Sequence, residues 1–403
     1  MISGMLRDAY SDVKKYYYDA KLQGLDWDAR YREYNAMIGK ARNQGEGLRV
    51  VASFLGGLND AHTFFIPPEH TNRYVSGYRS AIVGDNCFIT QVRPGTDAAS
   101  KLHVGDQVEM LDGFNVNRNE FHELHYLLDV LVPRGSQSFK LRSPEGEEGQ
   151  VVVNFQTTPS NTETVLANSV DYFDLMRRGE NEDHAWRSEI VENGDAAFWK
   201  WESFNIRAQD VDKAISVANK HKTLILDLRG NSGGSADTLA KLAGALFNHD
   251  VKICDRIGRK EGKPIMAQRH GQAFDGKLIV LVDSASAFES ELLARVVQIE
   301  HRGTVIGDKT AGYVMEAKYY KEAQGVEPIV NFGFNVTDAN LIMSDGKSLE
   351  NTGVTPDELL LPTAADLAAG RDPVLVRAAE LAGVKLDPVE AGKMFPFEWQ
   401  RLP

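Results

Sequence analysis

The sequence predicts an α/β protein built on a parallel sheet, and three observations support this fold class. After about residue 195, continuous apolar segments of strand length alternate with amphipathic helical segments. A helical region and then a region of short strands precede them. The chain has 403 residues, of which 42% are hydrophobic and 25% charged, so it can form two or three domains. We expect a helical domain over residues 1–76, a β-rich domain over 77–158 and an α/β core over 159–403.

The first 76 residues carry helical periodicity. In the segment GLRVVASFLGGL, one face of the helix collects the apolar residues Leu48, Val51, Phe54, Leu55 and Leu58. This helix is expected to end in LNDAHTFFIPPE, because consecutive prolines cannot continue a helix and force extended backbone before them.

Residues 77–158 change to short strands separated by turn signals. The strands read SAIV, NCFITQV, QVEMLDGFNV, SFKLRS and GQVVVNF, and one helical segment, FHELHYLLDVLV, lies among them. A polar and acidic tract over 157–194 then predicts a linker.

The core alternates the strands AAFWKWESF, TLILDLRG, KLIVLVD and GTVIG with the helices VDKAISVANKH, ADTLAKLAGALFN and FESELLARVVQIE. Right-handed crossovers place the carboxyl ends of such strands at one edge of the sheet, where ligands bind. Two of these ends are LRGNSGG and VDSASAFE. We therefore expect the functional site to form around them.

Composition excludes several classes of function. The formal net charge is −12 and no Lys/Arg cluster occurs, which argues against nucleic acid or an anionic membrane as the partner. Cys87 and Cys254 stand far apart, and the histidines lack metal-ligand spacing, so we expect no disulfide, metal or other cofactor. The amino terminus lacks the apolar stretch of a signal peptide.

The turn DLRGNSGGSAD is a candidate anion site. Gly230, Gly233 and Gly234 allow close approach of the backbone, and the following helix offers unpaired N–H groups in its first turn. A developing oxyanion could bind there. A tight turn without a ligand is the alternative interpretation.

The turn SASAFE is a candidate nucleophile site. A serine between a strand and a helix can stand exposed at the edge of the sheet, as in the nucleophile elbow of hydrolases. Spacing alone does not decide among Ser284, Ser286 and Ser290, and a capping serine in a small turn is the alternative. His62, at the break after the predicted helix, is the candidate base.

Taken in order, the motifs resemble the C-terminal processing, or tail-specific, serine peptidases and their relatives of the tricorn core type. The matching segments are LNDAHTFF, the run SAIVGDNCFITQVRPGTDAASKLHVGDQVEMLDGFNV, which is similar to a PDZ domain, LILDLRGNSGG, VDSASAFESELLA with VIGDKTAG, and DGKSLENTGVTPDELL. The resemblance spans residues 30–380. It implies a crotonase-like core of ββα units with an inserted PDZ-like domain.

The resemblance also implies a set of site residues. Ser286, three residues before Glu289, would be the nucleophile, and the N–H groups of Ala287 and of Gly233 or Gly234 would form the oxyanion hole. The lysine that follows T-x-G in the bacterial tail-specific branch is Tyr313 here, which implies the other, Ser-His-Glu branch. There His62 is the base and Glu350 orients it, as in other triads.

Two details of this set stay open. Some relatives carry a serine before the histidine, where this chain has Ala61. Lys309 is a rival base, although a basic role would require burial to depress its pKa. If His62 is the base, activity should fall below about pH 6.5, near the ordinary histidine pKa.

The predicted function is a serine endopeptidase that cleaves protein tails or unfolded chains, bound in extended form by the PDZ-like domain. The alternatives are a non-catalytic ligand- or peptide-binding protein on the same scaffold, and a scaffold in which the PDZ-like domain alone binds peptides. We expect no membrane span and allow for a homo-oligomer. Relatives are commonly exported, which favours an extracytoplasmic location.

Overall fold

The structure is a computed structural model that describes residues 1–159, 188–260 and 262–399. Most of the linker predicted over 157–194 therefore lies outside the described residues. Among the helices that are described, none is both long and apolar enough to cross a membrane.

The helices and strands of the described residues have the following bounds. The helices are α1 Ile2–Tyr16, α2 Trp27–Ile38, α3 Gln44–Gly56, α4 Phe121–His125 with its continuation Tyr126–Leu131, α6 Ala208–Ala218, α7 Ala236–Leu246, α8 Glu289–Ile299, α9 Ala364–Ala368, α10 Pro373–Leu381 and α11 Pro388–Lys393. The strands are β1 Phe64–Ile66, β2 Asn72–Val75, β3 Tyr78–Val83, β4 Asn86–Val92, β5 Gln107–Leu111, β6 Phe114–Asn115, β7 Ser136–Arg142, β8 Glu148–Asn154, β9 Gln156–Pro159, β10 Ser188–Asn193, β11 Ala196–Trp201, β12 Thr223–Asp227, β13 Val251–Gly258, β14 Ile265–Ala267, β15 Lys277–Val282, β16 Gly303–Gly307, β17 Met315–Gln324, β18 Val330–Met343 and β19 Glu358–Leu359.

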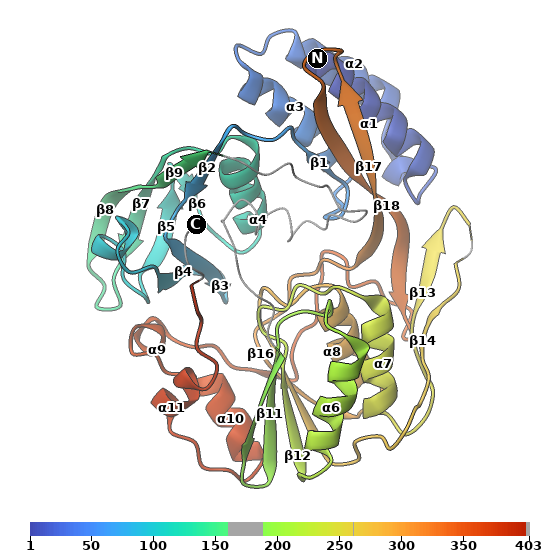
Figure 1. The fold of residues 1–403 in the computed structure, drawn as a ribbon. Helices are drawn as coiled ribbons and strands as arrows, with labels where there is room; N and C mark the ends of the chain where they lie inside the picture. Colours follow the sequence, from blue (N-terminus) through green and yellow to red (C-terminus); the bar gives the residue numbers. More distant parts are fainter. Residues whose placement is uncertain (160–187, 261, 400–403) are drawn as a thin grey trace.

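The core is a sheet in the order β10-β11-β12-β15-β16-β19. All of its pairs are parallel except β10 with β11. Helices α6, α7 and α8 cover one face, and α10 and α11 cover the other (Figure 1). Because both faces are covered, its central strands are apolar throughout, and every residue of β12 is buried.

A second sheet joins the amino-terminal helices to the core. Strand β18 is its centre, pairing with β1, β13 and β17, and α1 packs on it. The residues of α1, α3 and β18 share one apolar cluster, which contains Phe54, Phe65 and Phe334. In Figure 1 this sheet runs from the helices at the top of the molecule down to the core.

A middle unit, residues 72–159, has its own sheet in the order β3-β4-β5-β7-β8, with α4 beside it, and its own apolar cluster. It is tied to the core at the end of β3. There Gly84 N–H donates to Asp308 Oδ2 (2.9 Å) and Arg118 pairs with the same carboxylate (2.5 Å). The hydroxyl of Ser284 donates to the carbonyl of Ile82 (2.6 Å). The middle unit therefore meets the core at the strand-end turns.

The prediction of a mixed α/β fold is confirmed, and the predicted core strands and helices occur in the predicted order. Residues 1–76 are not wholly helical, because β1 and β2 lie at their end. Strands of three or four residues are too short for an alternation of apolar and polar side chains to be recognised in the sequence.

One ionic network fixes the turn after β12. Arg229 pairs with Asp227 (2.7 Å) and Asp372 (2.8 Å), and Lys200 reaches Asp227 (3.3 Å). Burial by itself raises the pKa of Asp227, but the charges of Arg229 and Lys200 outweigh burial and hold that pKa below its usual range. The network thus joins the end of β12 to the start of α10.

Replacing Arg229 by Met should reduce the free energy of unfolding by about 3 kcal/mol, because the buried carboxylate of Asp227 then keeps Lys200 as its one charged partner among the described residues, beside the main-chain N–H of residue 229. Urea unfolding followed by circular dichroism measures this. The matched control is Arg207→Met, which removes an exposed pair with Asp210 and should change stability by less than about 1 kcal/mol. Equal effects of the two substitutions would contradict the structural role of Arg229.

Candidate active site

The candidate site lies where β12 and β15 end and the segments carrying His62 and Glu350 approach them. The turn after β15 folds around Asp283, whose Oδ1 accepts the N–H groups of Gly230 (2.9 Å) and Ala285 (3.1 Å). This carboxylate joins the ends of the two strands. The turns thus have a fixed geometry before any ligand binds.

The serines of SASAFES all hydrogen-bond to main-chain carbonyls. Ser284 donates to Ile82, Ser286 to Leu228 (2.9 Å) and Ser290 to Asn231 (2.8 Å). Ser286 has no exposed surface, and its Oγ also lies 3.1 Å from Asp283 Oδ1. The row of hydroxyls therefore satisfies buried backbone groups at the end of the sheet.

Phe288 occupies the sharp bend between β15 and α8. It is the residue that caps the start of α8, and its backbone has φ 49° and ψ −108°, a strained conformation for a side chain of this size. Its ring lies 5.6 Å from the ring of His62, centre to centre. Phe288 thus lies two residues after Ser286, the predicted nucleophile, in the turn that faces His62.

His62 is buried, with 8% of its surface exposed. Its Nδ1 is buried and has no hydrogen-bond partner among the described residues. Burial lowers its pKa to about 4, so the imidazole is neutral at pH 7. This value lies below the ordinary histidine pKa near 6.5 on which the expected pH dependence of activity was based.

Glu350 joins the histidine segment to the segment after β16. Its Oε1 accepts the N–H of Ala61 (3.0 Å) and its Oε2 the N–H of Val314 (2.8 Å). Burial raises its pKa to about 8, and the charge of Asp60 adds to this effect. Side-chain atoms of His62 and Glu350 lie within 4.8 Å of each other. The structure thus brings together two of the three predicted catalytic residues, while the hydroxyl of Ser286 bonds to Leu228 instead.

The three predicted oxyanion donors are all occupied by acceptors of the protein itself. Gly233 N–H donates to Asn231 Oδ1 (2.9 Å), and Ala287 N–H to the Asn231 carbonyl (3.0 Å). Gly234 N–H donates to Glu289 Oε2 (2.6 Å). A Cβ added to Gly233 would meet Glu289 Oε2 at 2.5 Å and the Cβ of Phe288 at 2.9 Å, so these two side chains fill the space above the glycine turn.

Sequence reasoning missed Glu291. This buried carboxylate accepts from Thr310 Oγ1 (2.5 Å), Gly312 N–H (2.7 Å) and Tyr313 N–H (3.0 Å), and from the N–H of Phe288 (3.2 Å). Burial raises its pKa to about 7. The sequence held one signal for this glutamate, because Glu291 follows Phe288 at the same three-residue spacing at which Glu289 follows Ser286. Glu291 therefore bonds both to the TAG segment, at Thr310 and Gly312, and to Phe288, the residue that caps α8.

Among the described residues, one group has the geometry to hold a cation. It consists of Asp60, His62 and Glu350, and one donor atom from each lies within 4.8 Å of the others. Both Asp60 oxygens already accept hydrogen bonds, from His62 N–H (2.8 Å) and Thr63 Oγ1 (3.1 Å). Both Glu350 oxygens do as well. These bonds account for the carboxylates without a metal.

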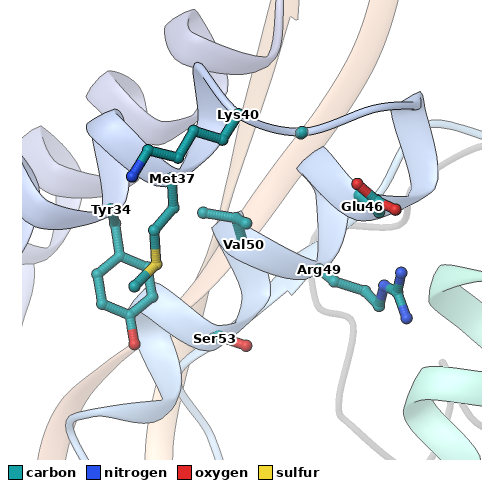
Figure 2. Close-up of a pocket in the computed structure, with 8 residues that line it drawn as sticks. Tyr34, Met37, Lys40, Glu46, Arg49, Val50 and Ser53 are labelled. Atoms are coloured by element: carbon teal, nitrogen blue, oxygen red, sulfur yellow. The ribbon is translucent and has the colours of Figure 1, made fainter.

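Two other candidates stand apart from the site. Lys309, the rival base, is exposed. A hollow of about 450 Å³ lies between α2 and α3, and Figure 2 shows the side chains around it. It shares none of the predicted site residues, and its lining consists of Tyr34, Met37, Lys40, Ala41, Glu46, Arg49, Val50 and Ser53.

Comparison with known proteins identifies the class. Residues 196–360 match the family model described as peptidase family S41, and residues 2–56 match the tricorn protease C1 domain. These matches, with the relatives below, confirm the resemblance to S41 serine-type peptidases of the carboxyl-terminal-processing and tricorn-like kind that the motifs predicted.

Individual relatives agree with this class. A Streptomyces coelicolor protein named as a tricorn protease homolog is 23% identical over 93% of this chain, which spans only 32% of that relative. The carboxyl-terminal-processing protease of Picosynechococcus sp. is 24% identical, covering 88% of this chain and 82% of that one. The crystal structure of mature CPAF shares the fold, with a TM-score of 0.66, 16% identity and coverage of 90% of this chain and 94% of that chain.

The raised pKa of Glu350 gives a pH dependence of stability with a definite sign. Its folded pKa of about 8 exceeds the unfolded value near 4.5, so the folded state binds the proton more tightly and this group's contribution to stability falls as pH rises from about 5 to 8. Chemical unfolding at several pH values should show a flatter profile for Glu350→Gln than for the wild type. The control is Glu390→Gln, an exposed position on α11, whose profile should match the wild type. A Glu350→Gln profile that is shifted in stability but keeps the pH dependence of the wild type would refute the raised pKa of Glu350.

Proposed function

We propose that this chain is a serine endopeptidase that hydrolyses protein tails or unfolded chains, with Ser286 as the nucleophile, His62 as the base and Glu350 as the residue that orients it. The observation that carries the proposal is that donor atoms of His62 and Glu350 lie within 4.8 Å of each other, in a site where His62 also contacts Phe288, two residues after Ser286. Of the functions inferred from the sequence, this is the leading one, and a non-catalytic peptide-binding protein on the same scaffold is the alternative.

Catalysis by Ser286 requires its hydroxyl to leave the Leu228 carbonyl and to give its proton to His62. The buried Leu228 carbonyl then loses a hydrogen bond, at a cost of about 1–3 kcal/mol. The N–H of Gly234 is engaged by Glu289, so a substrate oxyanion would have to displace that carboxylate to bind there.

The position of the middle unit supports polypeptide as the ligand. We propose that it acts as a PDZ-like domain that adds an extended chain to strand β3, the edge strand of its sheet. The carbonyl of Ile82 points away from β4 and toward the core, because it accepts from Ser284. A chain added along β3 would therefore run toward the turn that contains Phe288.

An aromatic segment of the chain itself already lies against this unit. The guanidinium of Arg79, on β3, lies 4.9 Å from the ring centre of Phe397, and that of Arg93 lies 5.5 Å from the ring centre of Trp399. This contact supports a surface that accepts apolar and aromatic side chains from a segment without regular structure.

A fluorophosphonate probe separates hydrolysis by Ser286 from the alternative, a non-catalytic peptide-binding protein on the same scaffold. We expect the wild type to form an adduct on Ser286 that disappears in His62→Ala, measured by intact mass and peptide mapping. A wild type that forms no adduct on any serine, while it still binds unfolded polypeptide, would overturn the proposal and favour the binding protein.

Binding is tested with fluorescein-labelled, reduced and carboxymethylated α-lactalbumin, an unfolded polypeptide. In a Ser286→Ala background, which removes cleavage, Ser80→Pro removes an N–H from the outer edge of β3, since Ser80 has the same orientation as Ile82, and should weaken binding about tenfold. The matched control is Val152→Pro on β8, the opposite edge of the same sheet, where the carbonyl also points outward, toward Lys101. Fluorescence anisotropy that shows equal affinity for all three proteins would rule out addition to β3.

A further inference from the structure

We propose that Tyr313 is a positioning residue for the imidazole of His62, and that His122 of the middle unit holds the ring of Tyr313 in place. The inference rests on the proposed function, in which His62 takes the proton of Ser286, and adds to it the side chains that orient this base. By the resemblance, Tyr313 stands where the bacterial tail-specific branch has its lysine base. The middle unit would thus contribute a side chain to the surroundings of the catalytic centre.

The imidazole of His62 is held mainly by packing between aromatic rings. The N–H of His62 donates to Asp60 Oδ1 (2.8 Å), but its Nδ1 is buried without a hydrogen-bond partner among the described residues. Both oxygens of the nearby Glu350 accept main-chain N–H groups instead. The rings of Phe288 and Tyr313 lie 5.6 and 6.5 Å from the imidazole, centre to centre. Both separations are typical of aromatic contacts, so these two rings limit the orientations that the imidazole can take.

The main chain around Tyr313 makes it a rigid support. Its N–H donates to Glu291 Oε2 (3.0 Å), and its carbonyl accepts the N–H of Phe288 (3.2 Å). The next residue, Val314, donates its N–H to Glu350 Oε2 (2.8 Å). Burial raises the pKa of the Tyr313 phenol, and the charges of nearby carboxylates raise it further, so the phenol is neutral at pH 7 and does not replace the lysine as a base. Tyr313 therefore acts through the position of its ring.

The ring of Tyr313 meets the middle unit at His122, in α4. The two rings pack edge to face, with 5.1 Å between their centres and 86° between their planes. Burial lowers the pKa of His122 to about 3, so this imidazole is uncharged at pH 7 and packs as a neutral ring. Just before α4, Arg118 pairs with Asp308 of the core (2.5 Å). This ion pair fixes the start of α4 where His122 can support Tyr313.

Loss of the Tyr313 ring should have two separate effects on His62. The imidazole can turn away from its productive orientation, which slows proton transfer from Ser286. Water also gains access to it. The titratable groups that face His62 are Asp60 and Glu350 in addition to Tyr313. Burial lowers the pKa of His62 to about 4, against the opposing charge of Asp60, so a better hydrated imidazole should have a higher pKa, nearer 6.5.

The first measurement is the rate at which a fluorophosphonate labels Ser286 in the wild type, Tyr313→Ala and Tyr313→Phe. In this reaction the serine oxygen bonds to phosphorus, the P–F bond breaks, fluoride leaves, and the hydroxyl proton passes to His62 and then to solvent. We expect Tyr313→Ala to slow labelling about tenfold or more. Tyr313→Phe should stay within about twofold of the wild type, because it keeps the ring and loses only the hydroxyl.

The second measurement is the pKa of His62, by NMR of the same variants with histidine-selective isotope labelling. The resonance that is missing in His62→Ala assigns this residue. In the wild type and Tyr313→Phe, His62 should not titrate between about pH 5.5 and 8, whereas in Tyr313→Ala its pKa should rise above about 5. This readout needs no catalysis. Failure of the proposed function is therefore seen separately, as a wild type that forms no adduct.

His122 is tested with the same two measurements. His122→Ala should slow labelling about threefold and raise the pKa of His62 slightly, while His122→Phe should behave as the wild type because it keeps an edge against Tyr313. The matched control is Tyr320→Ala, which removes a ring stacked on Tyr16 at 4.1 Å between centres, in the cluster of the amino-terminal helices. It should match the wild type in both measurements.

Two results would overturn the role of Tyr313. One is a folded Tyr313→Ala with the wild-type labelling rate and the wild-type pKa of His62. The other is a Tyr313→Phe that behaves as Tyr313→Ala, since the hydroxyl and not the ring would then be responsible. Circular dichroism checks folding, and Tyr313→Leu, which keeps apolar volume without a ring, takes the place of Tyr313→Ala if that variant is unfolded. Wild-type values for His122→Ala would remove the middle unit from the proposal.

Discussion

The site depends on buried carboxylates that accept main-chain N–H groups from segments distant in sequence. Glu350 bonds to Ala61 and Val314, and Glu291 bonds to Gly312, Tyr313 and Phe288. Without these acceptors, the N–H groups of three loops would be buried and unsatisfied. The same burial raises the pKa of each carboxyl, to about 8 for Glu350 and about 7 for Glu291. The position of His62 relative to α8 therefore follows from hydrogen bonding by these two glutamates.

Hydroxyl groups serve the same purpose for the carbonyls at the edge of the sheet. Parallel strands that end together leave carbonyls without sheet partners, and Ser286 and Ser290 donate to two of them, those of Leu228 and Asn231. Ser284 donates instead to the middle unit. This explains why a buried strand is followed by a row of small hydroxyl residues.

The fold and the chemistry of the site rest on different observations. The fold is shared with mature CPAF, and residues 196–360 match the S41 peptidase model. We expect the reaction to depend on the side chains at the turns where β12 and β15 end, among them Ser286, whose hydroxyl now bonds to the Leu228 carbonyl. Phe288, two residues further along, packs beside His62.

The sequence alone determined the class, the order of strands and helices in the core, and the two strand-end turns at which the site lies, because apolar periodicity and motif order are local properties. The resemblance it carries predicted Ser286, His62 and Glu350 as the site residues. Only the tertiary structure decided that Glu350 bonds to Ala61 and that Glu291 reaches Thr310 and Gly312. These contacts join residues distant in sequence, and no local pattern specifies them.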